Sequence, residues 1–260
     1  MSNEIKILNV TKKKQKYAVE TSKKTYLFHE DTIIQYYLFK DKVFTEDEFL
    51  SILDAEAIID LYSKALKFLS YQSRSTKEMR TFLSSKTDNA EHQNEVLMKI
   101  QNLGYLDDEK FASDVLDYEL RHQKGPKVIV NKLKQKGISD YIINKIVLKY
   151  DESQESIVLD DIVNKLSQRN QDEPLLKQKQ IIFQKLLRDG FSQSLILDAL
   201  SKVSFIDNSE QVLQNEIDKL QRRYQHLPSK EGNQKIIRHL MTKGYSYSII
   251  QTKLKEKTGD

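Results

Sequence analysis

The feature that most constrains the fold of this chain is a short pattern that occurs three times in its second half. In each copy, a leucine is followed by three other residues and then by a glycine, a large apolar residue and a serine. After two more residues, a pair of apolar residues completes the copy. The copies begin at Leu133, Leu186 and Leu240, and their glycines are 53 and 54 residues apart. A glycine that ends one helix and a serine that caps the next are typical of a reversal between two helices. The spacing therefore predicts a repeated helical unit of roughly fifty residues.

Other residues support the same repeat. Pro126, Pro174 and Pro228 each fall near the start of the middle helix of a unit, where the fixed φ of proline fits the first helical turn. An earlier stretch, about residues 58–103, has Leu83 at the leucine position but Thr87 where the glycine would fall. We interpret that stretch as a degenerate copy of the unit, or as a cap on the array.

Apolar residues recur at helical spacing between these reversals. We expect helices over Glu91–Leu103, Asp107–His122, Pro126–Lys136 and Ser139–Tyr150, and two further triplets of helices over about 153–203 and 208–256. In the helix that begins near Asp107, the apolar stripe is expected to consist of Phe111, Val115 and Tyr118. Two capping boxes, Thr45 with Glu48 and Ser75 with Glu78, are expected to open helices.

The first 29 residues have a different pattern. Short β-favouring runs around Ile5–Val10, Tyr17–Val19 and Thr25–Phe28 alternate with lysine-rich turns, so we expect two or three strands of a small antiparallel sheet. The run Lys12–Lys14 is either a phosphate-binding patch or a solvated turn beside an edge strand, and we favour the turn. Residues Asp31–Phe39 are expected to form a helix.

The predicted fold is therefore mainly α, with elongated tandem three-helix-bundle repeats after a small N-terminal segment that contains β structure. The expected domains are a small antiparallel sheet plus a helix over 1–54, and three-helix units over 55–104, 105–150, 151–206 and 207–260. Because each unit of such an array contacts mainly its neighbours, the array offers a long surface that suits a long partner.

Composition limits the compartment and the chemistry. The chain has no cysteine, which excludes disulfides, thiolate metal sites and a thiol nucleophile. No stretch approaches the roughly 18 apolar residues of a membrane span, and the first residues lack the apolar core of a signal peptide. We expect a soluble, cytoplasmic monomer that does not bind membranes.

No pattern in the sequence favours catalysis. The five histidines lack metal-ligand spacing and are expected at the surface or at helix ends, and no phosphate-binding glycine loop or nucleophile elbow is present. Asp107 and Asp108 form either a catalytic or magnesium-binding pair, or a helix cap with a dipole partner. We favour the cap, because both acids open a helix directly after a turn. The sequence thus predicts a protein that is not an enzyme and needs no cofactor and no metal.

Positive charge is concentrated in two helical segments. Residues 124–150 carry seven basic residues and one acid, and residues 208–260 carry ten basic residues and six acids, although the net charge of the whole chain is only +4. A solvated helix face and a surface for phosphates or an acidic protein remain equally acceptable readings of the first segment. We predict partner- or DNA-binding side chains at these cations: Arg74, Arg121, Lys124, Lys127, Lys132, Lys134, Lys136, Arg222, Arg223, Lys235, Arg238 and Lys243.

Three stretches resemble the RecX family of recombinase regulators. They are Ala65-x3-Leu69-x4-Arg74-Ser75-x2-Glu78-x4-Leu83-x2-Lys86, Leu103-Gly104-Tyr105-Leu106-Asp107-Asp108-x2-Phe111-Ala112 and Lys124-Gly125-Pro126-x2-Ile129-x3-Leu133-x2-Lys136-Gly137-Ile138. They cover about residues 58–150. The later units resemble the extra repeats of longer family members, and residues 1–54 resemble the strand-containing leader that some of those members carry.

The resemblance implies tandem three-helix repeats without catalytic activity. It also implies binding to the RecA recombinase filament on single-stranded DNA, and reduced filament extension, ATP hydrolysis, strand exchange and co-protease activity. The basic segments would then face acidic recombinase surface, or the phosphates of single- or double-stranded DNA. The alternative is a helical-repeat protein that binds nucleic acid without sequence preference and has no recombinase partner.

Overall fold

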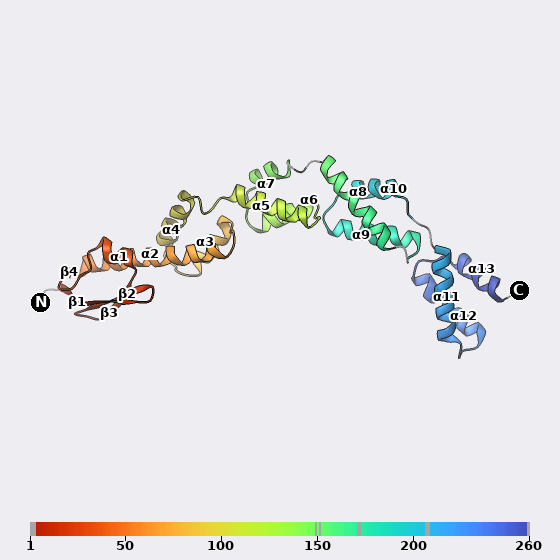
Figure 1. Ribbon diagram of the computed structural model, residues 1–260, viewed down its shortest axis with the longest axis horizontal. Helices are drawn as coiled ribbons and strands as arrows, with labels where there is room; N and C mark the ends of the chain where they lie inside the picture. The colour runs from red at the N-terminus through yellow and green to blue at the C-terminus, as the bar shows by residue number, and fades with distance from the viewer. Residues whose placement is uncertain (1–3, 149, 151, 171–172, 206–208, 259–260) are drawn as a thin grey trace. The chain divides into compact units, whose positions relative to one another are not determined.

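The structure is a computed structural model that describes residues 4–148, 150, 152–170, 173–205 and 209–258 (Figure 1). It contains two compact units. The first comprises Met1–Ser113 with Leu133–Ile142, and the second comprises Asp114–Lys132 with Ile143–Asp260. Within the described ranges, no helix is both long enough and apolar enough to cross a membrane.

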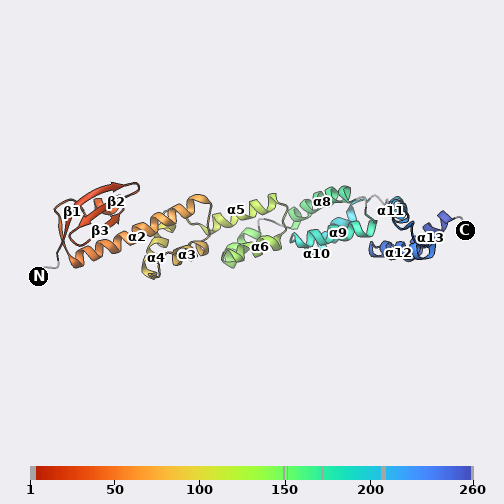
Figure 2. The same cartoon turned by 90° about the horizontal axis from the view of Figure 1, so that it is seen from below.

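The first unit begins with the expected antiparallel sheet. Its strands are β1 (Glu4–Lys13), β2 (Lys16–Thr21), β3 (Thr25–Phe28) and β4 (Val43–Thr45), in the order β3-β2-β1-β4. The helices α1 (Glu30–Gln35) and α2 (Glu46–Tyr71) supply Ile33, Phe49 and Ile52 to the apolar core that the sheet also lines (Figure 2). Strand β4 was not expected from the sequence, because three residues are too short a run to show alternation.

The helix predicted over Asp31–Phe39 is wrong beyond Gln35. Tyr37 has a left-handed backbone, with φ of 53°, and the N–H of Leu38 donates to the carbonyl oxygen of Ile33 over 3.0 Å. Leu38 is fully buried, so the chain brings it into the core through a turn. The apolar spacing alone could not separate a turn of this kind from a further turn of helix.

Both capping boxes are confirmed. The hydroxyl of Thr45 accepts from the N–H of Glu48 at the start of α2, and the hydroxyl of Ser75 accepts from the N–H of Glu78 at the start of α3. Helix α2 continues without a break across the domain boundary expected between residues 54 and 55. The helices that follow it in the first unit are α3 (Thr76–Ser84) and α4 (Ala90–Asn102).

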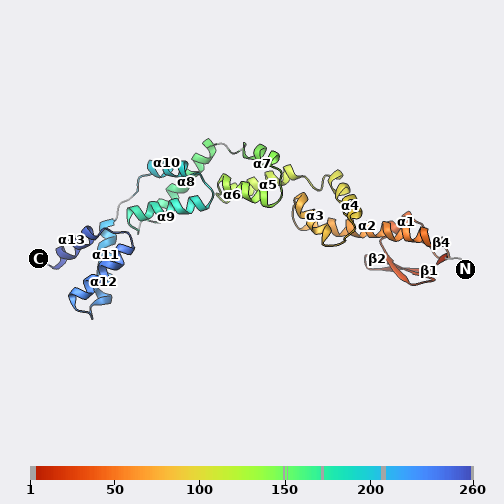
Figure 3. The same cartoon turned by 180° about the vertical axis from the view of Figure 1, so that it is seen from behind.

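The remaining helices follow the predicted triplets. They are α5 (Asp108–Arg121), α6 (Pro126–Gln135), α7 (Asp140–Val147), α8 (Glu152–Arg169), α9 (Leu175–Arg188), α10 (Gln193–Lys202), α11 (Ser209–Tyr224), α12 (Ser229–Thr242) and α13 (Tyr247–Thr258). The triplets α8–α10 and α11–α13, whose helices can be followed in Figure 3, each have an apolar core of their own. The expected boundaries at 150/151 and 206/207 involve residues outside the described part of the chain.

The glycines of the repeated pattern have the backbone that the sequence predicted. Gly137, Gly190 and Gly244 have φ values of 76°, 96° and 94°, and Gly104 has 73°. In the first helical unit the left-handed glycine, Gly104, follows α4, whereas α3 ends without one, at Ser85 in a right-handed conformation. Glycine adopts a left-handed backbone at little cost, so each of these positions ends a helix sharply.

Two contacts join the middle helices of successive triplets end to end. In the first unit, the hydroxyl of Ser75 at the start of α3 donates to the carbonyl oxygen of Lys136, just after α6, over 2.7 Å. In the second unit, the N–H groups of Gly125 and Lys127 at the start of α6 donate to the carbonyl oxygens of Asp189 and Gly190, just after α9, over 2.8 and 3.1 Å. At both junctions, donors at the start of one helix thus meet carbonyl oxygens just beyond the end of another: a side-chain hydroxyl at Ser75, and backbone N–H groups at Gly125 and Lys127.

Candidate functional site

The lysines of the basic segment are largely paired with acids from other parts of the chain. Lys124 Nζ lies 2.6 Å from Asp189 Oδ1, Lys136 Nζ lies 2.6 Å from Glu78 Oε1, and Lys132 forms an ion pair with Glu119. The sequence analysis found only one acid within this segment, because these acids lie 13 to 65 residues away. Three of its five lysines near α6 therefore carry charge that the fold already balances.

Glu119 explains the position of Lys132. Its side chain is on the inner face of α5 and the residue is only 5% exposed, and Lys132 reaches it from α6. A buried carboxylate without a cation would cost several kcal/mol, roughly 3–5 when one partner of such a pair is removed. The role of Lys132 is thus structural, because its ammonium group balances the buried charge of Glu119.

Asp189 sits where α6 meets α9. Burial raises the pKa of its carboxyl, but hydrogen bonds and charge from Lys124 and Lys185 outweigh burial and hold the pKa below its ordinary value of 3.8. The contact between the two helix ends therefore includes a carboxylate that stays ionised near neutral pH.

Glu78 has the same role where α3 meets α6. Burial raises the pKa of Glu78, while hydrogen bonds from Lys136 and from the N–H of Ser75 lower it more, so the pKa lies below 4.5. Arg74 Nη1 lies 3.6 Å from the same carboxylate, and the Arg74 guanidinium packs 4.2 Å from the ring centre of Phe68. Arg74 is thus packed into this junction.

The acid pair after Gly104 caps helices. Asp107 Oδ1 accepts from the N–H groups of Glu109 and Lys110 at 2.9 and 3.0 Å, and so caps α5. Asp108 Oδ1 accepts from the N–H of Thr76 at 2.9 Å, and so satisfies the start of α3. The two carboxylates point at different helix ends, and the preferred interpretation of the pair as caps is borne out by these contacts.

Three further predicted cations, at the end of α5 and along α6, face solvent. Arg121, at the end of α5, and Lys127, at the start of α6, are exposed and form no ion pair within the described part of the chain. Lys134 has one exposed partner, Asp140, at 3.5 Å. An exposed pair of this kind contributes little stability, so Lys134 is available to a partner at small cost.

Tyr118 does not belong to the buried stripe of α5 that the sequence predicted. Tyr118 is 48% exposed. The predicted Phe111 is buried, Val115 is half-buried, and Ala112, Leu116 and Glu119 complete the buried face of α5. The ring of Tyr118 stacks on His122 with centroids 4.1 Å apart, and Lys132 Nζ lies 5.1 Å from the Tyr118 ring centre. An aromatic pair therefore lies beside Arg121, and helical spacing alone could not show which face of α5 is inward.

In the last triplet, the predicted cations divide in the same way. Lys243 Nζ lies 2.7 Å from Glu216 Oε2, and this hydrogen bond lowers the pKa of Glu216. Lys235 pairs with Glu231 one turn earlier on α12, at 3.1 Å. The cations that remain exposed without an ion pair in the described ranges are Arg222, Arg223 and Arg238.

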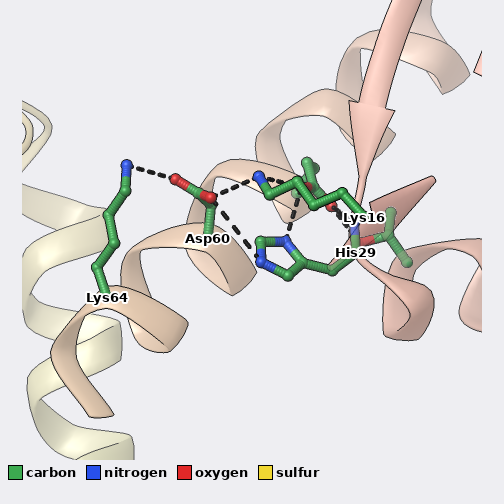
Figure 4. A network of polar contacts seen from close by, with 6 residues as sticks. Lys16, His29, Asp60 and Lys64 are labelled. Atoms are coloured by element: carbon green, nitrogen blue, oxygen red, sulfur yellow. Dashed lines mark hydrogen bonds and ion pairs between the residues drawn. The ribbon is translucent and has the colours of Figure 1, made fainter. Parts of the chain in front are cut away.

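A polar network joins the sheet to α2 (Figure 4). Glu56 accepts from the backbone N–H and Nδ1 of His29, from the hydroxyl of Thr32 and from Lys16 Nζ, over 2.6 to 3.3 Å. Asp60 pairs with Lys16 at 2.5 Å and with Lys64. These contacts leave no acceptor position of Glu56 facing open solvent.

His29, Glu56 and Asp60 have the residue types of a metal site, with candidate ligand atoms within 4.8 Å of one another. Lys16 Nζ already contacts both carboxylates, so an ammonium group holds the position that a cation would take. The network is therefore interpreted as an ion-pair cluster. His92 lies in the first turn of α4, at a helix end as the sequence predicted, where it is buried and its Nε2 lies 2.8 Å from Asp54 Oδ1.

Comparisons with known proteins agree on one family. Residues 208–254 match the family model described as "RecX, third three-helix domain", and residues 107–146 match "RecX, second three-helix domain". The chain is 32% identical over 259 residues to "Regulatory protein RecX" of Streptococcus pyogenes serotype M4 (strain MGAS10750), covering 96% of this chain and 99% of that protein. It is 30% identical over 252 residues to the protein of the same name from Listeria monocytogenes serotype 4b (strain F2365), covering 94% and 93%.

Solved structures give the same result. A crystal structure of regulatory protein RecX matches with a TM-score of 0.58 and 26% identity, covering 75% of this chain and 99% of the other. The crystal structure of RecX from Lactobacillus salivarius matches with a TM-score of 0.52 and 29% identity, covering 57% and 97%.

Proposed function

Because this chain belongs to the RecX family of regulatory proteins, we propose that it binds the RecA recombinase filament on single-stranded DNA and limits its activity. The expected effects are reduced filament extension, ATP hydrolysis, strand exchange and co-protease activity, and thus control of recombination and DNA repair. The observation that carries this proposal is similarity to regulatory RecX proteins over 96% of the chain. A regulator of this kind acts by binding and needs no reaction of its own.

Ion pairing within the fold supports some of the predicted contact residues better than others. Lys124, Lys132 and Lys136 are engaged in pairs within the fold, so they are poor candidates for direct contact. The exposed cations without such pairs are better candidates: Arg121, Lys127, Arg222, Arg223 and Arg238. Several modest contacts of this type add up when one chain engages several subunits of a polymer.

One titration tests the proposal. The protein is added to recombinase-coated and to bare single-stranded DNA, and both binding and ATP hydrolysis are followed. We expect preferential binding to the coated DNA and a fall in ATP hydrolysis. Equal binding to coated and bare DNA, with unchanged hydrolysis, would support a general nucleic-acid-binding protein instead.

Charge reversal tests the contact residues. We expect the double variant Arg121→Glu, Lys127→Glu to inhibit ATP hydrolysis less, and to lose part of the salt dependence of binding, because exposed charges act through screened attraction. The matched control is Arg80→Glu on α3, which also reverses an exposed arginine without an ion pair among the described residues. If both variants inhibit ATP hydrolysis as well as the parent protein does, Arg121 and Lys127 have no part in binding.

A further inference from the structure

The turn between α1 and β4 displays two aromatic side chains on the surface of the first unit. Tyr37 is 62% exposed and Phe39 is 54% exposed, and their ring centres lie 6.3 Å apart at an interplanar angle of 63°. Leu38, between them, is fully buried. The chain thus anchors one side chain in the core and turns both neighbouring rings towards solvent.

The backbone of this turn is held firmly. The N–H of Phe39 donates to the carbonyl oxygen of Tyr37 over 2.8 Å, and the N–H of Asp41 donates to that of Ile7 in β1 over 2.9 Å. Tyr37 and Asp41 have φ values of 53° and 67°, which are uncommon for residues other than glycine and persist only when the surroundings fix them. The rings are therefore presented by a fixed scaffold, so little conformational entropy is lost when a ligand covers them.

The charge around the two rings is cationic. Asp41 pairs with Lys6 at 2.9 Å, and that contact lowers the pKa of Asp41. Lys42 Nζ lies 5.9 Å from the ring centre of Tyr37. Glu48, whose carboxylate is attracted to Lys42, accepts a hydrogen bond from the N–H of Thr45. The neighbouring Lys40 is exposed, and neither Lys40 nor Lys42 forms an ion pair within the ranges that the structure describes.

We propose that Tyr37 and Phe39 form a stacking site for single-stranded nucleic acid, with Lys40 and Lys42 contacting its phosphates. Every base presents a flat π face, so an aromatic ring beside cations binds single strands with little sequence preference. Bases within a duplex already stack on one another, so the same rings gain little from double-stranded DNA. Two planar rings, with Lys40 next to Phe39 in sequence and Lys42 beside the ring of Tyr37, fit this ligand better than an acidic peptide, which offers charge without flat surfaces.

The test uses the full chain without recombinase and a fluorescein-labelled oligothymidine of about thirty nucleotides, longer than the roughly 4–16 nucleotides that one platform covers. We expect Tyr37→Ala, Phe39→Ala to weaken binding by about thirtyfold or more, while Tyr37→Phe, Phe39→Tyr, which keeps both rings, binds as the parent does. Lys40→Ala, Lys42→Ala should reduce the slope of log affinity against log salt by about one to two.

Three controls make the result decisive. Tyr71→Ala removes a tyrosine that is 72% exposed elsewhere on the same unit, and it should leave binding unchanged. A duplex of the same length should bind more weakly, and vesicles of anionic phospholipid should not compete. Unchanged oligothymidine binding by a folded Tyr37→Ala, Phe39→Ala variant, equal affinity for the duplex, or competition by vesicles would each overturn the proposal. Because recombinase is absent, its failure leaves the proposed regulatory function untouched.

Discussion

At the scale of single residues, glycine meets two different physical requirements in this chain. Gly137, Gly190 and Gly244 take a left-handed backbone, which the repeated pattern predicted. Gly125 does not, but a Cβ atom there would lie 2.5 Å from the backbone carbon of Gly190 and from the backbone nitrogen of Phe191. Backbone atoms cannot move aside as a flexible side chain can, so Gly125 is fixed by a close approach between two segments of chain.

Gly125→Ala should therefore destabilise the protein by about 1–3 kcal/mol, because the added methyl group overpacks the contact between α6 and α9. The matched control is Gly232→Ala in α12, where a Cβ would meet its nearest atom at 3.7 Å, an ordinary contact. That change should stabilise by about 0.5–1 kcal/mol, because alanine is the better helix former. Urea unfolding of both variants measures the sign of each change in the free energy of unfolding. If Gly125→Ala did not destabilise the protein, the close approach at Gly125 would be contradicted.

Asp189 makes part of the stability depend on pH. Its folded-state pKa lies below the ordinary value, so its contribution is present above the unfolded pKa, near 4, and is lost as pH falls through the folded pKa. The melting temperatures of the parent and Asp189→Asn should differ most above about pH 5 and converge in strong acid. A difference that stays constant down to about pH 2 would show that the charge is not responsible.

At the scale of elements, polar side chains decide how helices and strands attach to one another. The network of Glu56 ties the backbone before α1, the hydroxyl within α1 and Lys16 of β2 to a single carboxylate on α2. The carboxylate accepts every one of these bonds. An amide in its place would turn two N–H donors of its NH₂ group towards backbone and side-chain groups that also donate. The attachment of the sheet to α2 thus depends on the acceptor oxygens of one side chain.

Glu56→Gln should destabilise the first unit by roughly 2–4 kcal/mol, since it puts an NH₂ group in place of one carboxylate oxygen that accepts hydrogen bonds, and leaves the Lys16 ammonium with Asp60 as its only carboxylate partner in the network. Glu95→Gln, at an exposed position of α4 with no ion pair in the described ranges, is the matched control and should change stability by less than about 0.5 kcal/mol. Thermal unfolding followed by circular dichroism distinguishes the two. Equal small effects would mean that the network contributes little.

At the scale of the whole molecule, the apolar cores are separate. One comprises residues of the sheet with α1 and α2, and another comprises residues of α11–α13, including Leu240. Cores that share no residue lend one another stability only through the contacts between neighbouring units. A single unfolding free energy does not describe such a chain.

Leu240→Ala should remove about 2–5 kcal/mol from the last core. Hydrogen exchange followed by mass spectrometry should then show faster exchange in α11–α13, with unchanged exchange in β1 and β2. The reciprocal variant Ile7→Ala, at a fully buried position of β1, should accelerate exchange in the sheet and leave α12 unaffected. A uniform loss of protection in either variant would show that the cores unfold together.

Several features of the fold could be predicted because their causes are local. The capping boxes at Thr45 and Ser75, the strands of the first 29 residues and the left-handed glycines depend on residues a few positions apart.

The candidate site was less predictable from the sequence than the fold. Lys124 and Asp189 are 65 residues apart in sequence, so a count of charges along one segment treated Lys124 as unbalanced.

The sequence by itself determined the repeated three-helix plan, the small sheet and the family, because periodicity, caps and motifs are encoded in short stretches. Only the tertiary structure decided which cations are free, why Gly125 must be glycine, and that Tyr118, Tyr37 and Phe39 face solvent. The physical reason is the same in each case. Burial, ion pairing and steric exclusion are properties of neighbours in space, and here those neighbours come from distant parts of the chain.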